Sequence, residues 1–211
     1  IANGDWSSDV CSSDLNNQFS MTQKIAISAL FAALAYIAFQ FLKIPIKLPG
    51  AGGSTYFHLG NTFVVLGALM LGGVYGGLAG GIGMAIADIT SGEPIYAVTT
   101  LFLKLVMGLI AGLVAHKIGH INEKTETKQY MIWCTAAAVV SLGANIVLDP
   151  LVGFFRNKYL FQVDAHLTDI VAKLTAGVTF VNAVLSVIAV CILYRVLRPA
   201  LQKAGVLHKE A

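Results

Sequence analysis

Lys104 occupies a position in this sequence that needs a chemical explanation. It falls within the apolar stretch 96–116, roughly 12 Å from the start of a helix that rises ~1.5 Å per residue. An isolated charge in apolar surroundings is costly, so such a side chain faces a cavity or a partner. Lys104 therefore either pairs with a carboxylate such as Asp88 or Asp149, or binds a ligand from an outer cavity.

Three more polar side chains lie inside or at the ends of apolar stretches. Asp88 falls near the end of the stretch 75–91, where it is either a solvated carboxylate in the headgroup region or part of a site. Asn145 and Asp149 are four residues apart and share a helix face. Asn145 is predicted to contact a ligand or to hydrogen-bond a neighbouring helix. Asp149 precedes Pro150, where we expect the helix to end or kink.

The segment YFHLGNTF adds Tyr56, His58 and Asn61 near the start of the stretch 59–74. His58 is either a ligand-binding or pH-sensitive group or an interfacial histidine. Tyr56 belongs either to the site or to an aromatic belt at the membrane surface. These polar residues gather at one predicted end of the helices, which favours an outward-open pocket. Weaker candidates for the same pocket are Thr175, Thr179 and Asn182.

Motifs for catalysis or cofactor binding are absent from the sequence. It contains no Gly-x-Ser-x-Gly, no His-Glu-x-x-His and no phosphate loop ending in Gly-Lys-Ser/Thr. No Cys/His cluster indicates a metal, and no dense basic run indicates nucleic acid. We therefore expect neither an enzyme nor a cofactor or metal site. Transport driven by ATP would require an ATPase on another chain.

The composition is that of a membrane protein. Hydrophobic residues make up 56% of the 211 residues and charged residues 12%, whereas soluble domains carry about 25% charged residues. Helices and closed barrels are the structures that span a bilayer, and the apolar stretches lack strict alternation. We expect an all-α integral membrane protein, a compact bundle of six transmembrane helices. The six stretches are 22–42, 59–74, 75–91, 96–116, 130–150 and 170–195.

The distribution of Lys and Arg predicts the orientation of this bundle. Six crossings place both termini on one side of the membrane. If that side is the cytoplasm, eight of these residues lie inside and four outside, which favours cytoplasmic termini. The four outside are Lys43, Lys47, Arg156 and Lys158.

The first twenty residues differ from the rest of the chain. They are polar, contain SSDV and SSDL, and resemble a translated sequencing adapter. They lack the basic and apolar regions of a signal peptide. We expect residues 1–20 to be a non-native leader, residues 21–200 to form the membrane domain, and residues 201–211 to be a cytoplasmic tail.

The glycine-rich stretch GGVYGGLAGGIGMAIAD predicts close helix packing. Its glycines form two series with a spacing of four: Gly72, Gly76 and Gly80, and Gly73, Gly77 and Gly81. Residues four apart share a helix face, and small residues there let membrane helices approach closely. The first glycines also suit a tight bend between two spans, since glycine tolerates a positive φ.

Residues from Met21 to about Pro199 resemble the substrate-binding S components of energy-coupling-factor (ECF) vitamin transporters. The resemblance lies in ALFAA, in HLGNTFVVLGALMLGGVYGGLAGGIGMAIADITSG and in LFLKLVMGLIAGL. The last two look like the branch for hydroxymethylpyrimidine, pyridoxine and related vitamins. The resemblance implies a multi-pass protein of a bacterial cell membrane with an outward-facing vitamin site. It also implies that the loop KIPIKLPGAGGSTYFHLG covers this site.

The same resemblance implies partners. Ala29 and Ala33, on a small-residue stripe of the first span, would dock onto a membrane coupling subunit driven by two ATPase subunits. Transport would then involve toppling of the S component in the bilayer. Two other functions compete with this one: a stand-alone secondary transporter, although no two-half symmetry is evident, and an intramembrane enzyme, although a catalytic set is lacking.

Overall fold

The computed structural model describes residues 20–48 and 54–203. The predicted leader therefore lies almost entirely outside the described residues, as do Gly50, Gly52 and Gly53 of the predicted covering loop and most of the tail. In chain order the elements are α2 (Met21–Gln40), β1 (Ile44–Lys47), β2 (Ser54–Phe57), α3 (Gly60–Leu71), α4 (Gly73–Thr90), α5 (Pro94–Gly112), η1 (Leu113–Ile118), η2 (Ile121–Glu123), α6 (Thr127–Phe155), η3 (Arg156–Leu160) and α7 (Ala165–Lys203).

Each predicted apolar stretch coincides with one of the helices α2 to α7. Four helices are long and apolar enough to cross a membrane: Met21–Gln40, Pro94–Ile118, Thr127–Leu160 and Ala165–Gln202. These helices support a helical, multi-pass membrane protein. The helix α3 is shorter, at 12 residues, and α4 is not among the four, so the count of six crossings remains a prediction.

Local sequence signals explain where two helices begin. Ser20 caps α2, because its side chain accepts a hydrogen bond from the backbone N–H of Gln23 while the Gln23 side chain accepts one from Ser20. Pro94 occupies the first turn of α5, where its missing N–H leaves no hydrogen bond unmade. An end or a kink was predicted at Pro150, and the helix does not end there, since α6 continues through it to Phe155. Membrane helices tolerate such a proline when neighbouring groups satisfy the freed carbonyl.

The helix α4 packs through glycine faces, as the sequence predicted. A Cβ added at Gly76 would lie 2.0 Å from the backbone nitrogen of Ala68 in α3. One added at Gly77 would lie 2.9 Å from the carbonyl oxygen of Leu105 in α5. The first series therefore packs against α3 and the second against α5. A positive φ of 89° at Gly72 makes the turn from α3 into α4.

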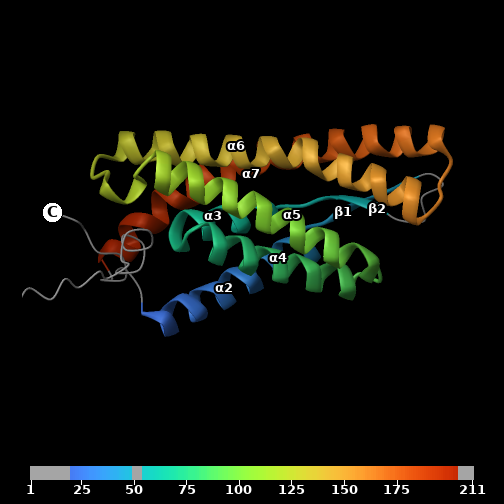
Figure 1. The fold of residues 1–211 in the computed structure, drawn as a ribbon. Helices are drawn as coiled ribbons and strands as arrows, with labels where there is room; N and C mark the ends of the chain where they lie inside the picture. The colour runs from blue at the N-terminus through green and yellow to red at the C-terminus, as the bar shows by residue number, and fades with distance from the viewer. Residues whose placement is uncertain (1–19, 49–53, 204–211) are drawn as a thin grey trace, which may run out of the picture.

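A two-stranded hairpin was not predicted. β1 pairs antiparallel with β2, with Ile44 opposite Phe57 and Lys47 opposite Ser54. Each strand has only four residues, too few for an alternating pattern to stand out. β2 lies against α7, and Figure 1 shows the hairpin beside the long helices.

The described ends of the chain lie together. Figure 1 shows the start of α2 and the end of α7 at the same end of the bundle, as an even number of crossings requires. The hairpin and the turn between α4 and α5 lie towards the other end. The side of the membrane that each end faces remains a prediction from the Lys and Arg count.

Candidate functional site

A cavity lies between the hairpin and the helices at this second end of the bundle. It encloses about 100 Å³ and is lined by side chains from α2, β2, α4, α5, η3, α6 and α7. Of the seven sequence-predicted site residues, the lining includes Tyr56, His58, Asp88, Lys104 and Asp149. The three weaker candidates from α7 line it as well: Thr175, Thr179 and Asn182.

The two predicted asparagines lie outside this lining. Asn145 is buried behind Lys104 and contacts it. Asn61 is buried in the first turn of α3, and its side-chain oxygen has no hydrogen-bond partner among the described residues. The structure therefore connects Asn145 to the cavity through Lys104 and does not bring Asn61 to it.

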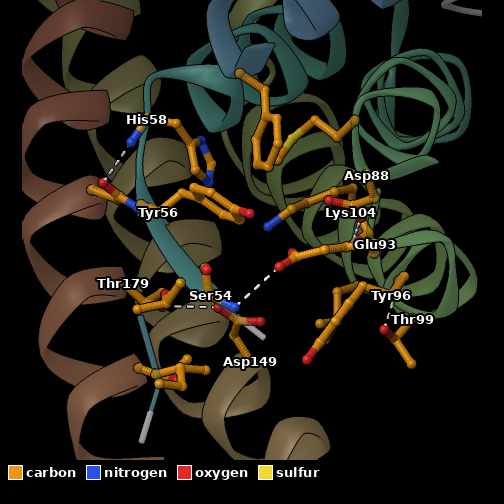
Figure 2. Close-up of a pocket in the computed structure, with 18 of the residues that line it drawn as sticks. Ser54, Tyr56, His58, Asp88, Glu93, Tyr96, Thr99, Lys104, Asp149 and Thr179 are labelled. Carbon is orange, nitrogen blue, oxygen red and sulfur yellow. Dashed lines mark hydrogen bonds between the residues drawn. The ribbon is translucent and has the colours of Figure 1, made fainter. Parts of the chain in front are cut away.

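Lys104 is 5% exposed and its ammonium points into the cavity (Figure 2). Its Nζ donates a hydrogen bond to the Oδ1 of Asn145 over 3.3 Å. No carboxylate lies within 4.0 Å of it, since the ion pairs of the described residues join His120 to Glu123 and Lys173 to Asp169. A direct structural pair with Asp88 or Asp149, one of the two predicted readings, is therefore not formed.

Each carboxylate of the cavity accepts a hydrogen bond from a neutral donor. The hydroxyl of Thr100 donates to Asp88, which is 5% exposed and so is not a solvated headgroup residue. The hydroxyl of Thr179 donates to Asp149 over 2.8 Å. A third carboxylate, Glu93, accepts from the backbone N–H of Ser54 over 3.1 Å and so ties the hairpin to the α4–α5 turn (Figure 2).

Asn182 holds the end of β2 against α7. Its side-chain amide donates to the carbonyl of Tyr56 over 2.8 Å, and its oxygen accepts from the backbone N–H of His58 over 3.1 Å. The amide thus pairs with the strand as a neighbouring strand would. Phe39 of α2 packs on the other side, with its ring centre 5.5 Å from that of Tyr56 and 4.7 Å from that of His58.

The imidazole of His58 is held neutral. Its Nδ1 accepts a hydrogen bond from the backbone N–H of Gly60 over 3.1 Å, which places the proton on Nε2. Burial of the ring, together with the nearby charge of Lys104, lowers the pKa of His58 to about 3. The predicted pH-sensitive role is therefore not supported near neutral pH, and His58 can donate one hydrogen bond from Nε2.

This depressed pKa predicts an acid-sensitive fold. Below pH 6.5 the unfolded chain takes up a proton on His58 that the folded chain accepts only near pH 3. The contribution of His58 to the free energy of unfolding is therefore fully present above pH 6.5. Below that pH it falls by at most about 1.4 kcal/mol per pH unit. We expect the melting temperature in detergent to drop between pH 7 and pH 5. In His58→Asn, whose Oδ1 can accept from the N–H of Gly60, the melting temperature should depend less on pH than in the wild type. If the melting temperatures of the two proteins fall in parallel, His58 is not the group that causes the acid sensitivity.

Several lining residues were not predicted from the sequence. Arg156 was counted among the charges outside the membrane and not as a site residue, but its guanidinium carbon lies 4.0 Å from the centre of the Tyr96 ring. Its Nη1 donates to the hydroxyl of Thr99 over 3.1 Å. The sequence does contain a signal for the face of α5 that lines the cavity. Tyr96, Thr100 and Lys104 are spaced by four residues, so they share one face of a helix. The position of Arg156 depends on the continuation of α6 into η3, whereas the helix was expected to end or kink at Pro150.

A metal site finds no support in the part of the chain that the structure describes. Within residues 20–48 and 54–203, no group of three His, Cys, Asp or Glu side chains is arranged to hold a metal ion.

The small-residue stripe of α2 divides between two faces. Ala32 packs inward, and a Cβ at Gly83 of α4 would lie 2.1 Å from its carbonyl oxygen. Ala29 and Ala33 are exposed on the outside of the bundle. These two alanines are therefore not part of the buried face of α2.

Comparisons with known proteins match this sequence to a protein family. A family model described as the S component of ECF-type riboflavin transporters matches residues 19–199. A segment of 67 residues is 36% identical to a protein of Pyrococcus woesei described as an uncharacterized protein in a gap 3′ region. This match covers 32% of the present chain and 45% of that relative, so the chain spans less than half the relative's length. No solved structure matches.

Proposed function

Because this chain belongs to the family of S components of ECF-type riboflavin transporters, we propose that it is the substrate-binding membrane subunit of an ATP-driven vitamin importer. S components bind a small vitamin substrate and work with membrane and ATPase subunits. They are transporter components rather than a class of enzyme. The observation that carries the proposal is the polar cavity at one end of an apolar helical bundle.

The composition of the cavity suits capture of a small polar molecule. Binding pockets combine apolar and aromatic walls with a few well-placed polar groups. Here Phe39, Met84 and Tyr96 supply the walls, and Lys104 and Asp88 are among the polar groups. The free space of about 100 Å³ is small beside the roughly 300–1,000 Å³ of typical ligand pockets. A vitamin would therefore displace side chains of the lining when it binds.

Two kinds of vitamin are candidates for the substrate. The name of the family points to riboflavin, whereas the motifs of α3 to α5 resemble the hydroxymethylpyrimidine and pyridoxine branch. All three molecules are flat nitrogen heterocycles with polar substituents. We propose that the substrate is a vitamin or precursor of this kind, taken up from outside the cell.

Mass spectrometry of small molecules released from the purified protein tests this function. The protein is solubilised in mild detergent, washed and denatured, and the released compounds are quantified against the chain. We expect a flat heterocyclic vitamin at close to one per chain. If nothing is released, titration of the washed protein with riboflavin, hydroxymethylpyrimidine and pyridoxine follows. Failure of all three to bind would contradict the proposal.

A second experiment separates an S component from a stand-alone secondary transporter. Vesicles that contain this chain alone should bind the vitamin without accumulating it, because no phosphate loop is present to use ATP. Accumulation in such vesicles, driven only by an ion gradient, would favour the secondary transporter.

A further inference from the structure

Two cysteines meet between α6 and α7, away from the cavity. Cys134 of α6 is wholly buried, whereas Cys191 of α7 is partly exposed. A hydrogen bond joins the two thiols. Asp149, which lines the cavity, lies about 22 Å further along α6 than Cys134, at a rise of ~1.5 Å per residue. The pair of cysteines is therefore separate from the site already described.

The hydrogen bonds around the two thiols run in one direction. The hydroxyl of Thr135 donates to the carbonyl of Met131 over 2.8 Å. A hydroxyl has one proton to donate, so the S–H of Cys191 donates to the Oγ1 of Thr135, over 3.3 Å. The sulfur of Cys191 is then left to accept the S–H of Cys134. The order of donation is therefore from Cys134 to Cys191 and from Cys191 to Thr135.

This order favours a negative charge on Cys191 rather than on Cys134. If Cys191 loses its proton, the hydroxyl of Thr135 can rotate from the Met131 carbonyl to the Cys191 sulfur, to which the S–H of Cys134 already donates. Two donors then face the thiolate, which is the nucleophilic form of cysteine. Cys191 is also the more exposed of the two. It is therefore the thiol suited to attack an oxidant, and Cys134 is placed to react with the product.

We propose that Cys134 and Cys191 are a redox-active pair that a hydroperoxide converts into a disulfide between α6 and α7. The Cys191 thiolate attacks one oxygen of hydrogen peroxide: an S–O bond forms, the O–O bond breaks, and the leaving hydroxide takes up the thiol proton as water. The sulfur of Cys134 then attacks the sulfenic acid on Cys191. An S–S bond forms, the S–O bond breaks, and a second water leaves with the Cys134 proton. Two thiols are thereby oxidised and one peroxide is reduced.

The disulfide would link the two longest helices of the described chain, α6 with 29 residues and α7 with 39. Hydrogen peroxide is small and uncharged, so it reaches a partly exposed thiol inside an apolar bundle. Both helices also contribute side chains to the cavity, so the cross-link limits how far these two walls can move apart. Exchange with a small thiol such as glutathione reverses the modification.

Thiol counting in the detergent-solubilised protein tests the reaction. The chain has three cysteines, and Cys11 is first replaced by Ser so that only Cys134 and Cys191 are counted. The protein is treated with hydrogen peroxide, quenched with catalase, denatured and labelled with a maleimide. We expect both thiols to be labelled before treatment and neither after it, with an intact mass lower by two hydrogens and full recovery in dithiothreitol. Retention of both thiols, or a cross-linked dimer on a non-reducing gel, would overturn the proposal.

Single cysteine variants test which thiol attacks the peroxide. In Cys134→Ser the reaction should stop at the sulfenic acid of Cys191, which dimedone traps as an adduct that mass spectrometry locates. In Cys191→Ser, Cys134 should keep its thiol under the same treatment and give no adduct. An adduct on Cys134 in Cys191→Ser, with none on Cys191 in Cys134→Ser, would overturn the assignment of Cys191 as the attacking thiol.

Variants of Thr135 test the hydrogen bond to the Cys191 thiolate. Thr135→Val removes the hydroxyl and keeps the shape of the side chain, and we expect it to slow disulfide formation by about tenfold, the effect of one lost hydrogen bond. The matched control Thr135→Ser keeps the hydroxyl and should react at close to the wild-type rate. If Thr135→Val and Thr135→Ser lose their thiols equally fast, the hydroxyl does not stabilise the thiolate and this part of the proposal is wrong.

Discussion

We expect Gly76→Leu to prevent the bundle from assembling, and Gly76→Ala to destabilise it by about 3 kcal/mol or more. A Cβ at this position would lie 2.0 Å from the nitrogen of Ala68, 2.3 Å from the carbonyl carbon of Gly67 and 2.4 Å from the Cα of Ala68. All three are backbone atoms, so no change of rotamer can relieve the contact. The helices α3 and α4 would have to separate along their shared face.

A matched control distinguishes this clash from a general effect of replacing helical glycines. Gly143 lies inside α6, and a Cβ added there meets nothing within 4 Å. Gly143→Ala should be neutral or stabilise the protein by up to about 1 kcal/mol, because alanine favours the helix.

Thermal unfolding of the three proteins in the same detergent gives the comparison, with size-exclusion chromatography to show that each is monodisperse. We expect Gly76→Leu to elute as aggregate and Gly76→Ala to melt well below the wild type. A melting temperature of Gly76→Ala equal to that of Gly143→Ala would contradict the packing of α4 against α3.

The glycine series show what a sequence can reveal about a membrane bundle. Length and hydropathy mark the helices, because the bilayer imposes both. The spacing of four marks their close contacts, since bulk cannot occupy that face. The two glycine series indicated two separate packing faces of α4. Which helices pack on those faces, α3 and α5, is a property of the assembled bundle.

The candidate site was less predictable for a physical reason. Asp88 and Lys104 stood out because charges are rare in apolar stretches, and both line the cavity. Arg156 sits beyond Pro150, where a helix end was expected, so its place over Tyr96 could not be read from the pattern. Asn61 looked equivalent to its neighbours in YFHLGNTF, yet the rotation of α3 buries it outside the lining.

Ala29→Leu and Ala33→Leu are expected to abolish transport while leaving vitamin binding intact. Both alanines are exposed on α2, whereas Ala32 beside them packs against Gly83. A leucine at either exposed position therefore does not disturb the bundle. If a coupling subunit docks here by close helix contact, the added bulk separates the two backbones.

Transport and binding have to be measured on the same variants. Uptake is followed in vesicles that contain the chain with the coupling and ATPase subunits that the proposed function requires, and we expect it to fall below about a tenth of the wild-type rate. Affinity for the vitamin in detergent should stay unchanged, and co-purification of the coupling subunit should be lost. The control is Gly177→Leu, which adds the same bulk at an exposed position of α7 where a Cβ meets nothing within 4 Å.

These measurements separate docking from the other possible roles of the two alanines. Normal transport by Gly177→Leu alongside loss in both alanine variants would localise the contact to this face of α2. Loss of binding in the alanine variants would mean that the leucines distort the cavity, since Phe39 at the end of the same helix packs on Tyr56 and His58. Wild-type uptake by both alanine variants would place the coupling subunit on another face of the bundle.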